Sequence, residues 1–353
     1  MVINTDQNRQ TSNYRPIIKY INIYSKDVYG LVEVGHDREY PFQRLPQYCK
    51  KSLRDEVWDL SENSSGVSVS FKTNSTKILV KWGLKLDFKM NHMAETGIKG
   101  VDLYGKFENG WQYLSSCLPV GTKNEQTLFE NFPKVIREYR LHLPLYDTVT
   151  ELQLGVNKTS EFEIIRSEKL PIVFYGTSIT QGGCASRPGL AHTNIISRIL
   201  DLECINLGFS GNGHMEVSVG SILSKIKAKL IVIECMANVD LKTVKKNTIP
   251  LIESIRKGRV GNVPSIIFLE EAIVNDNFPD KKIVDSIHNK NKELKNQIVE
   301  ATKLGYENLY LIHQNGLIDL DTESTVDGVH YNDLGFERHA KHFVSQLKQL
   351  KII

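Results

Sequence analysis

Four short stretches of the chain carry residue types that together could transfer an acyl group. They are PIVFYGTSITQGGCASRPG (171–189) with Ser178, LGFSGNG with Gly211, ECMANVD with Asn238, and DGVHYND with Asp327 and His330. Acyl transfer by a serine needs a nucleophile, a base, a group that orients the base, and donors for the oxyanion. Residue types suited to all four tasks are present.

The spacing of Asp327 and His330 suits a base and its orienting carboxylate. Three residues apart on one turn, the carboxylate can reach the imidazole Nδ1–H and fix the tautomer whose Nε2 accepts a proton. Gly211 has no Cβ, so its backbone N–H can approach a substrate oxygen closely. Asn238 offers a neutral side-chain donor.

Each of these residues also has a plainer interpretation. A serine after a strand is commonly a helix cap, a glycine or asparagine in a loop commonly only shapes the turn, and Asp-x-x-His before a helix is a common capping pattern. Their occurrence in order, at the ends of successive strands, favours the catalytic interpretation.

The second half of the chain predicts the elements that would position these residues. Continuous apolar runs are typical of strands buried on both faces of a parallel sheet, and the runs are IVFY (172–175), CINL (204–207), LIVIEC (230–235), SIIFLE (265–270) and LYLIH (309–313). Between them lie helical segments such as 241–257, 281–304 and 334–349. Five strands alternating with helices predict a doubly wound α/β sheet, whose ligand chemistry gathers at the carboxyl ends of the strands.

In the first half of the chain, apolar residues recur at every second position. GVSVSF (66–71), KILVKWGLKLDF (77–88), YRLHLPL (139–145) and VTELQLGV (149–156) place apolar residues on one parity, and turn residues separate them. This pattern predicts an antiparallel sandwich or jelly roll. A short helix is expected near EQTLFENF (125–132). The period of the apolar residues changes over 157–169. This change predicts a β-domain at 1–168 packed against an α/β catalytic domain at 169–353.

Composition excludes several classes of protein. The 353 residues carry 44 basic and 41 acidic side chains, a net charge of +3, which argues against nucleic acid or an anionic membrane as the main partner. Five cysteines without CxxC spacing indicate a reduced compartment with no disulfide framework and no structural zinc. The polar N-terminus predicts a cytoplasmic protein as the chain stands, or an extracellular or periplasmic one if a leader was removed. The oligomeric state is left open.

At these motifs the chain resembles the SGNH or GDSL hydrolase superfamily. The first motif there is usually Gly-Asp-Ser, and this chain has Gly-Thr-Ser at 176–178. The glycine of the second motif is matched by Gly211 in FSGN, and the last motif, Asp-x-x-His, by DGVH at 327–330. The third motif, Gly-x-Asn-Asp, corresponds to MANV at 236–239, which keeps only the asparagine. These departures place the chain in a divergent branch.

A second resemblance narrows that branch. GVDLY (100–104) looks like the motif of the β-rich domain that precedes some SGNH esterases, and QGGCASRPG (181–189) is similar to an extended sequence after the nucleophile in the same proteins. The resemblance implies a jelly-roll N-terminal domain, a flavodoxin-like catalytic domain, no metal and no cofactor. It also implies acyl-ester substrates, often acetylated sugars, so that the expected partner is a small-molecule or saccharide ester.

The mechanism implied is that of a serine esterase. Ser178, His330 and Asp327 would form the triad, and the backbone N–H groups of Ser178 and Gly211 with the Asn238 side chain would hold the oxyanion. Arg187, close behind the nucleophile, would orient a polar substrate or brace its loop. An acyltransferase would use the same residues and differ only in the acceptor, while a catalytically silent carbohydrate-binding protein is the alternative from another class.

Three other interpretations are disfavoured. Cys184 could be a thiol nucleophile, although a small buried cysteine is the favoured interpretation. His330, His339 and His342 invite a zinc site, but no carboxylate motif suited to a bound hydroxide accompanies them. GTSITQGG lacks the Gly-Lys-Ser/Thr ending of a phosphate-binding loop.

Overall fold

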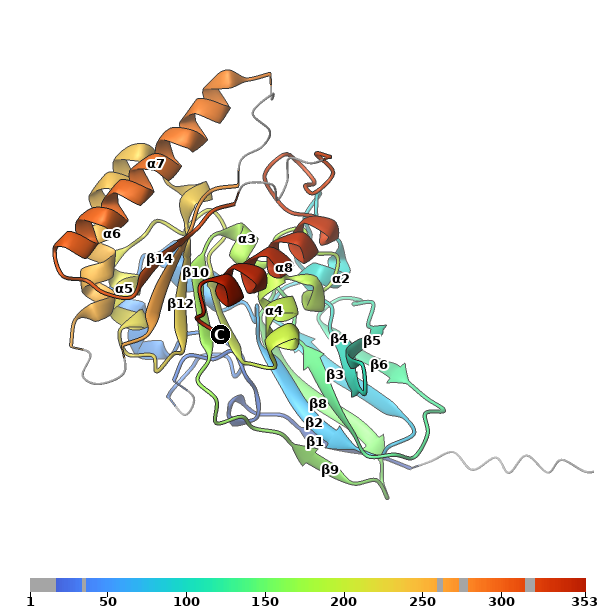
Figure 1. The fold of residues 1–353 in the computed structure, drawn as a ribbon. Coiled ribbons are helices and arrows are strands. Elements are labelled where there is room, and N and C mark those ends of the chain that lie inside the picture. Colours follow the sequence, from blue (N-terminus) through green and yellow to red (C-terminus); the bar gives the residue numbers. More distant parts are fainter. Residues whose placement is uncertain (1–16, 34–35, 259–262, 273–278, 315–320) are drawn as a thin grey trace, which may run out of the picture.

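A computed structural model describes residues 17–33, 36–258, 263–272, 279–314 and 321–353 (Figure 1). The polar N-terminal stretch, residues 1–16, lies outside these ranges. Among the helices described, none is both long enough and apolar enough to cross a bilayer.

Two antiparallel sheets form the first part of the molecule. One sheet has the order β1-β8-β3-β6, with bounds Ile18–Asn22, Val149–Asn157, Ile78–Leu84 and Lys123–Phe129. The other has the order β5-β4-β7-β2-β9, with bounds Gly110–Ser116, Asp102–Phe107, Arg137–His142, Ser68–Thr73 and Phe162–Ile164. The predicted β-sandwich is therefore present.

The core of the sandwich comes from the alternating residues that the sequence displays. Val69 and Phe71 of β2 and Trp82 of β3 are all buried and share one hydrophobic cluster. Alternate side chains of a strand point to opposite faces, so residues of one parity from each sheet meet between the sheets.

Two local predictions in this part are wrong. Strand β3 ends at Leu84, and Leu86 and Phe88, expected on its buried face, are 49% and 42% exposed. The Leu86 N–H donates to Asp147 Oδ1, which holds the chain outside the sheet. The helix expected at 125–132 is instead strand β6 paired with β3, because the pairing supplies backbone hydrogen bonds and burial that a short isolated helix would lack.

The second part contains the predicted parallel sheet. Its five strands have the order β11-β10-β12-β13-β14, with bounds Cys204–Gly208, Ile172–Gly176, Leu230–Glu234, Ser265–Leu269 and Leu309–Ile312. This is the flavodoxin-like order, in which the chain reverses direction across the sheet beside the first strand. Gly176 is in register with Gly208 and with Glu234, so the loops after these three strands leave the same edge together.

Helices cover both faces of the parallel sheet (Figure 1). One face packs against α5, α6 and α7 (Val217–Leu223, Leu241–Arg256 and Lys281–Lys303). The other packs against α4 and α8 (His192–Leu200 and Asp333–Gln349). Two short helices, α1 and α2 (Asp55–Ser61 and Glu95–Ile98), belong to the first part of the chain.

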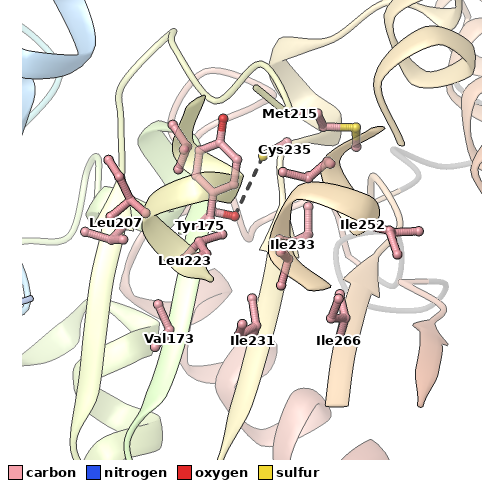
Figure 2. Close-up of a cluster of buried hydrophobic side chains, with 14 of the residues drawn as sticks. Val173, Tyr175, Leu207, Met215, Leu223, Ile231, Ile233, Cys235, Ile252 and Ile266 are labelled. Carbon is pink, nitrogen blue, oxygen red and sulfur yellow. Dashed lines mark hydrogen bonds between the residues drawn. The ribbon is translucent and has the colours of Figure 1, made fainter. Parts of the chain in front are cut away.

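Figure 2 shows the packing of the sheet against α5 and α6. Val173 and Tyr175 of β10 lie beside Ile231 and Ile233 of β12 on this face, and all four are buried. Alternate residues of the same strands, such as Phe174 and Val232, pack on the opposite face. The continuous apolar runs therefore serve two cores, which explains why they do not alternate.

The two parts of the molecule are packed against each other through buried polar contacts. Arg44, fully buried, donates from Nη1 to the carbonyl oxygens of Asn206 and Gly208, at 2.9 and 2.8 Å. Burial lowers the pKa of Arg44 to about 9. Ser65 Oγ donates to the carbonyl oxygen of Gln181 at 2.6 Å. These contacts tie the β-rich part to the end of β11 and to the turn after β10.

Candidate active site

Ser178 is the first residue of the short helix α3 (Ser178–Gln181), which directly follows β10. Thr177 caps this helix, since its hydroxyl accepts a hydrogen bond from the Ile179 N–H at 3.2 Å. The turn is tight: a Cβ added to Gly176 would lie 1.9 Å from Thr180 Oγ1. Only glycine fits there, and the sharp turn places Ser178 at the carboxyl edge of the sheet.

A continuous hydrogen-bond chain links Ser178 to His330 and Asp327. Ser178 Oγ lies 2.9 Å from His330 Nε2, and His330 Nδ1 lies 2.7 Å from Asp327 Oδ2. With Nδ1 donating to the carboxylate, Nε2 is left to accept from the serine hydroxyl. The structure thus brings together three residues that are up to 152 positions apart.

Asp327 is held as a carboxylate by its own loop. Its Oδ1 accepts from the backbone N–H groups of Val329 and His330, at 3.0 and 2.8 Å. Burial raises the pKa of Asp327, but the hydrogen bonds from this loop outweigh burial and lower the pKa to about 2. Asp327 is therefore ionised at neutral pH and can stabilise a protonated His330.

Gly211 lies in the loop after β11 and has a φ of +68°, in the left-handed region. A Cβ added there would meet nothing within 4 Å. The backbone conformation, rather than lack of space, is what requires glycine at this position. No described residue accepts a hydrogen bond from the N–H of Gly211 or of Ser178, so both are available to a ligand.

Asn238 ends the 3-10 turn after β12, and its orientation is fixed by a neighbour. Its Oδ1 accepts from the Gly213 N–H at 3.3 Å, and Gly213 itself is so close to β10 that a Cβ there would lie 2.5 Å from the Gly176 carbonyl oxygen. Within the described ranges nothing accepts from Asn238 Nδ2. Asn238 is thereby attached to the loop of Gly211, beside the strand that leads to Ser178.

The β-rich part of the molecule supplies two residues near the triad that the sequence did not single out. Tyr146 is buried and its hydroxyl donates to the Ser178 carbonyl oxygen at 3.4 Å. The His92 ring lies 5.6 Å from the His330 ring in an edge-to-face arrangement. No local pattern marks these residues; only the packing of the two parts brings them to the site.

Cys184 has the properties of a structural thiol. It is 7% exposed, and burial together with the nearby Asp327 charge raises its pKa to about 11. The thiolate needed for nucleophilic attack is scarce at neutral pH. The favoured sequence interpretation of this residue agrees with its environment.

Arg187 is held at the boundary between the two parts of the molecule. Its Nη1 donates to Asp102 Oδ2 at 2.7 Å and to the Tyr104 hydroxyl at 2.6 Å. Asp102 is fully buried and also accepts from the Gly189 N–H at 3.0 Å. The GVDLY and QGGCASRPG motifs therefore bind each other, and Arg187 braces its loop. Substrate binding by Arg187 stays a prediction.

The three histidines whose types invite a zinc site are separated. His342 Nε2 lies 2.7 Å from the carbonyl oxygen of His313, whereas His339 faces Glu234 and His330 faces Ser178. Two groups of three among the described residues do have ligand atoms within 4.8 Å of one another: His92 with Cys184 and His330, and His192 with Glu234 and His339.

A cavity of about 460 Å³ adjoins the triad. Thr177 and Ile179, the neighbours of Ser178, line it together with Asp327, Gly328 and Val329. The exposed lining surface is mainly apolar, from side chains such as Met236, Leu269, Ile283, Ile287 and Tyr331, although half of the other lining residues are polar or charged. The cavity is large enough for an organic group of moderate size.

Two family models match the chain. Residues 169–348 match the GDSL-like lipase/acylhydrolase family, and residues 18–162 match the GxDLY family, described as the N-terminus of proteins of the Esterase_SGNH_hydro type. Each match contains the motifs that carry the corresponding resemblance in the sequence. None of the curated proteins compared with the chain matches it.

Solved structures share the fold over nearly the whole chain. A GDSL-like lipase from Bacteroides ovatus is 30% identical, with a TM-score of 0.87, and the alignment covers 94% of this chain and 98% of that chain. Salicylyl-acyltransferase SsfX3, from a tetracycline biosynthetic pathway, is 15% identical with a TM-score of 0.76 and coverages of 95% and 98%. A family two carbohydrate esterase from Clostridium thermocellum, solved with cellohexaose, is 13% identical with a TM-score of 0.59 and coverages of 82% and 94%. At these lower identities the last two show likeness of fold alone.

Proposed function

The chain belongs to the GDSL-like lipase/acylhydrolase family, and from that premise we propose that it is a serine esterase that removes short acyl groups, acetyl first among them, from a carbohydrate or a related small molecule. The observation that carries the proposal is the hydrogen-bond chain from Ser178 Oγ through His330 to Asp327 at the carboxyl edge of the parallel sheet.

Acylation begins with proton transfer from Ser178 to His330. Nε2 takes the hydroxyl proton as Oγ attacks the ester carbonyl carbon, and the carbonyl oxygen becomes an oxyanion. The N–H groups of Ser178 and Gly211 and the Asn238 side-chain amide would donate to it. His330 then gives its proton to the leaving alcohol, and the acyl group stays on Ser178 Oγ.

Deacylation repeats these steps with water as the nucleophile. His330 Nε2 takes a proton from water, the hydroxide attacks the acyl-enzyme, and the proton returns to Ser178 Oγ as the acid leaves. Asp327 stays ionised throughout, because its pKa of about 2 lies far below the pH at which the base works. The donors need no rearrangement between the two halves, which is the advantage of a preorganised oxyanion hole.

Support for a saccharide alcohol comes from the site's neighbours. His92 of the β-rich part is partly exposed and lies beside the His330 ring, so a substrate larger than a simple ester would contact this part as well. The esterase solved with cellohexaose has the same fold. We therefore assign the β-domain, residues 1–168, to the wall of the site, and residues 169–353 to catalysis.

The second candidate function is acyl transfer to a hydroxyl of a sugar or natural product. The likeness to the salicylyl-acyltransferase over 95% of the chain and the largely apolar cavity beside the triad favour it. Only the acceptor in deacylation would change. A catalytically silent carbohydrate-binding protein is the least supported alternative, because such a protein would not need the hydrogen-bonded triad.

The decisive experiment is a screen of acetylated saccharides and of p-nitrophenyl esters with acyl chains of increasing length. Wild type and Ser178→Ala are compared, with Ser221→Ala on the outer helix α5 as the matched control. We expect turnover by wild type and Ser221→Ala only. Release of free acid distinguishes hydrolysis from transfer to an added acceptor alcohol. Ester cleavage by purified Ser178→Ala would overturn the assignment, and glycan binding without any turnover would support the silent alternative.

A further inference from the structure

A second polar cluster lies directly beneath the turn that carries Ser178. Its members are His192 at the start of α4, Glu234 at the end of β12 and His339 in α8, and they are 0%, 9% and 1% exposed. We call these three residues the buried cluster. Aromatic rings enclose it: Phe336 stacks on His192 and Phe174 meets it edge to face. Two imidazoles and a carboxylate are thus removed from water, where each needs a partner.

The geometry of the buried cluster is not that of hydrogen-bond donors facing an acceptor. His192 Nε2 lies 3.1 Å from Glu234 Oε2, and His339 Nε2 lies 3.1 Å from Glu234 Oε1. The distances are short enough, yet neither ring's nitrogens make a hydrogen bond of acceptable direction. Nitrogen and oxygen atoms bonded at about 2.0–2.1 Å to one tetrahedral centre stand roughly 3.3 Å apart. The separations therefore match ligands that share a centre.

The geometry points to a structural site for one divalent transition-metal ion, with Zn²⁺ the best fit, bound by His192, Glu234 and His339. Two imidazole nitrogens and one carboxylate oxygen supply three donor atoms, and a water molecule would complete the tetrahedral set. Imidazole with carboxylate and without thiolate suits zinc better than the alkaline-earth ions, which prefer oxygen ligands alone. Glu234 also lines the 460 Å³ cavity, which gives the ion a route in.

Such an ion would brace the nucleophile without touching the substrate. Glu234 Oε2 accepts from Thr180 Oγ1 at 2.6 Å, and Thr180 lies in α3 two residues after Ser178. A hydrogen bond to a ligating carboxylate orients the ligand and is itself fixed by the ion. The site would join α3, α4, β12 and α8 beneath the catalytic edge, and the proposed acyl transfer has no step that passes through it.

The other group of possible ligands, His92, Cys184 and His330, is less suited to a resident ion. His330 is already hydrogen-bonded on both ring nitrogens, to Ser178 and to Asp327. Burial raises the pKa of the Cys184 thiol to about 11, which keeps it protonated. This group serves as the rival site in the test.

The experiment measures metal directly in the full-length protein. Protein stripped with a chelator is exposed to micromolar Zn²⁺, separated from free ion and assayed by plasma mass spectrometry. We expect one Zn²⁺ per chain in wild type, and a rise in Tm of about 5 °C on adding back the ion. Glu234→Gln should lose both effects. His342→Gln, changed one turn further along α8 outside the cluster, and Cys184→Ser should keep both.

A measurement on the wild type covers the case in which Glu234→Gln fails to fold. Co²⁺ replaces Zn²⁺ and gives visible absorption bands, and X-ray absorption of the Zn²⁺ form reports its ligands. We expect bands of a four-coordinate site and a shell of nitrogen and oxygen with imidazole scattering. A stripped wild type that takes up no Zn²⁺, a sulfur ligand, or loss of the ion in Cys184→Ser would each overturn the proposal.

Discussion

Two clusters of imidazole and carboxylate lie close together in this molecule and differ mainly in their access to water. In the triad, the side chains of His330 and Asp327 are 24% and 40% exposed. In the buried cluster, the side chains of His192, Glu234 and His339 are 0%, 11% and 1% exposed. The chain links them through α3, where Ser178 faces the first and Thr180 the second.

The direction of the hydrogen bonds separates the two clusters further. In the triad, Ser178 Oγ and Asp327 Oδ2 each lie within hydrogen-bond distance of one His330 ring nitrogen, as the proposed proton transfer from Ser178 requires. In the buried cluster the ring nitrogens have no aligned hydrogen-bond acceptor among the described residues. The same chemical groups therefore suit proton transfer at one place and a fixed, structural role at the other.

Removing the nucleophile gives the largest expected effect on the rate of ester cleavage. Ser178→Ala should lower kcat/KM by about 10⁴-fold or more, since the remaining oxyanion hole and binding contacts give only residual catalysis. Its Tm should match wild type, because the hydroxyl bonds only to His330 among the described residues. Esterase kinetics and thermal unfolding measure both. A large fall in Tm would mean that Ser178 belongs with the structural cluster instead.

Asp327→Asn should lower kcat by about 10⁴-fold, because an amide favours the wrong tautomer of His330. The amide oxygen can still accept from the backbone N–H groups of Val329 and His330, so the loop should keep its shape. Kinetics and a crystal structure of the variant test this. A variant with an intact loop and near-normal kcat would exclude Asp327 as the orienting group.

Asn238→Ala should lower kcat by about 10²–10³-fold with little change in KM, as loss of one oxyanion donor does. The side chain also accepts from the Gly213 N–H, so Asn238→Asp is the informative partner: it keeps the acceptor and loses the donor. Both variants should be slow. Normal turnover by Asn238→Asp would show that Asn238 only shapes the Gly211 loop.

Glu234→Gln should have a larger effect on thermal stability than on the rate of ester cleavage. Asp327→Asn should do the reverse, with a large fall in kcat and an intact loop. Disrupting a buried charged cluster should lower Tm by about 5 °C or more. The rate of ester cleavage should fall by less than about tenfold, because we expect Ser178 to move by well under ~1 Å. A displacement of about 1 Å would cost roughly a hundredfold in rate. Kinetics and thermal unfolding of both variants side by side decide whether the two clusters have separate roles.

Folding stability at low pH should also depend on the buried cluster. The pKa of Glu234 in the folded protein lies below its ordinary value of 4.5, so its ionisation stabilises the fold above pH 4.5. That contribution is lost as pH falls from 4.5 through the lower folded-state pKa. Wild type should therefore lose more stability than Glu234→Gln below pH 4.5 in urea unfolding. Equal losses would place the acid sensitivity elsewhere.

Arg187→Lys should have the smallest effect on the rate of ester cleavage, within about threefold. Lysine keeps the positive charge beside Asp102, so the loop of residue 187 should stay largely in place. Lysine cannot reproduce the planar guanidinium between Asp102 and Tyr104, so Tm should fall slightly. A large rise in KM with unchanged Tm would instead support substrate binding by Arg187.

Local sequence pattern predicted some elements well and others poorly, for identifiable reasons. The helices at 241–257, 281–304 and 334–349 agree with α6, α7 and α8 because long amphipathic segments have few alternative packings. Leu86 and Phe88 continue the alternation of β3 but lie outside it, because Asp147 captures the backbone at residue 86. Alternation alone does not say where a neighbouring loop will end a strand.

The sequence by itself predicted which residues meet at the carboxyl edge of the parallel sheet. Apolar runs specify a parallel sheet, parallel strands end at one edge, and residues that directly follow those strands must meet there. Asp327 and His330 are three residues apart, so their contact is local. The order of strands and loops along the chain is therefore enough to place Ser178, Gly211 and Asn238 together.

The tertiary structure alone decided what surrounds the triad. His192 and His339 meet Glu234 because α4 and α8 pack side by side on one face of the sheet, and no short pattern encodes that contact. Arg187 reaches Asp102, and His92 reaches His330, only because the two parts of the molecule dock. Contacts across such interfaces depend on the summed packing of many side chains, whereas the ends of parallel strands are fixed by the backbone.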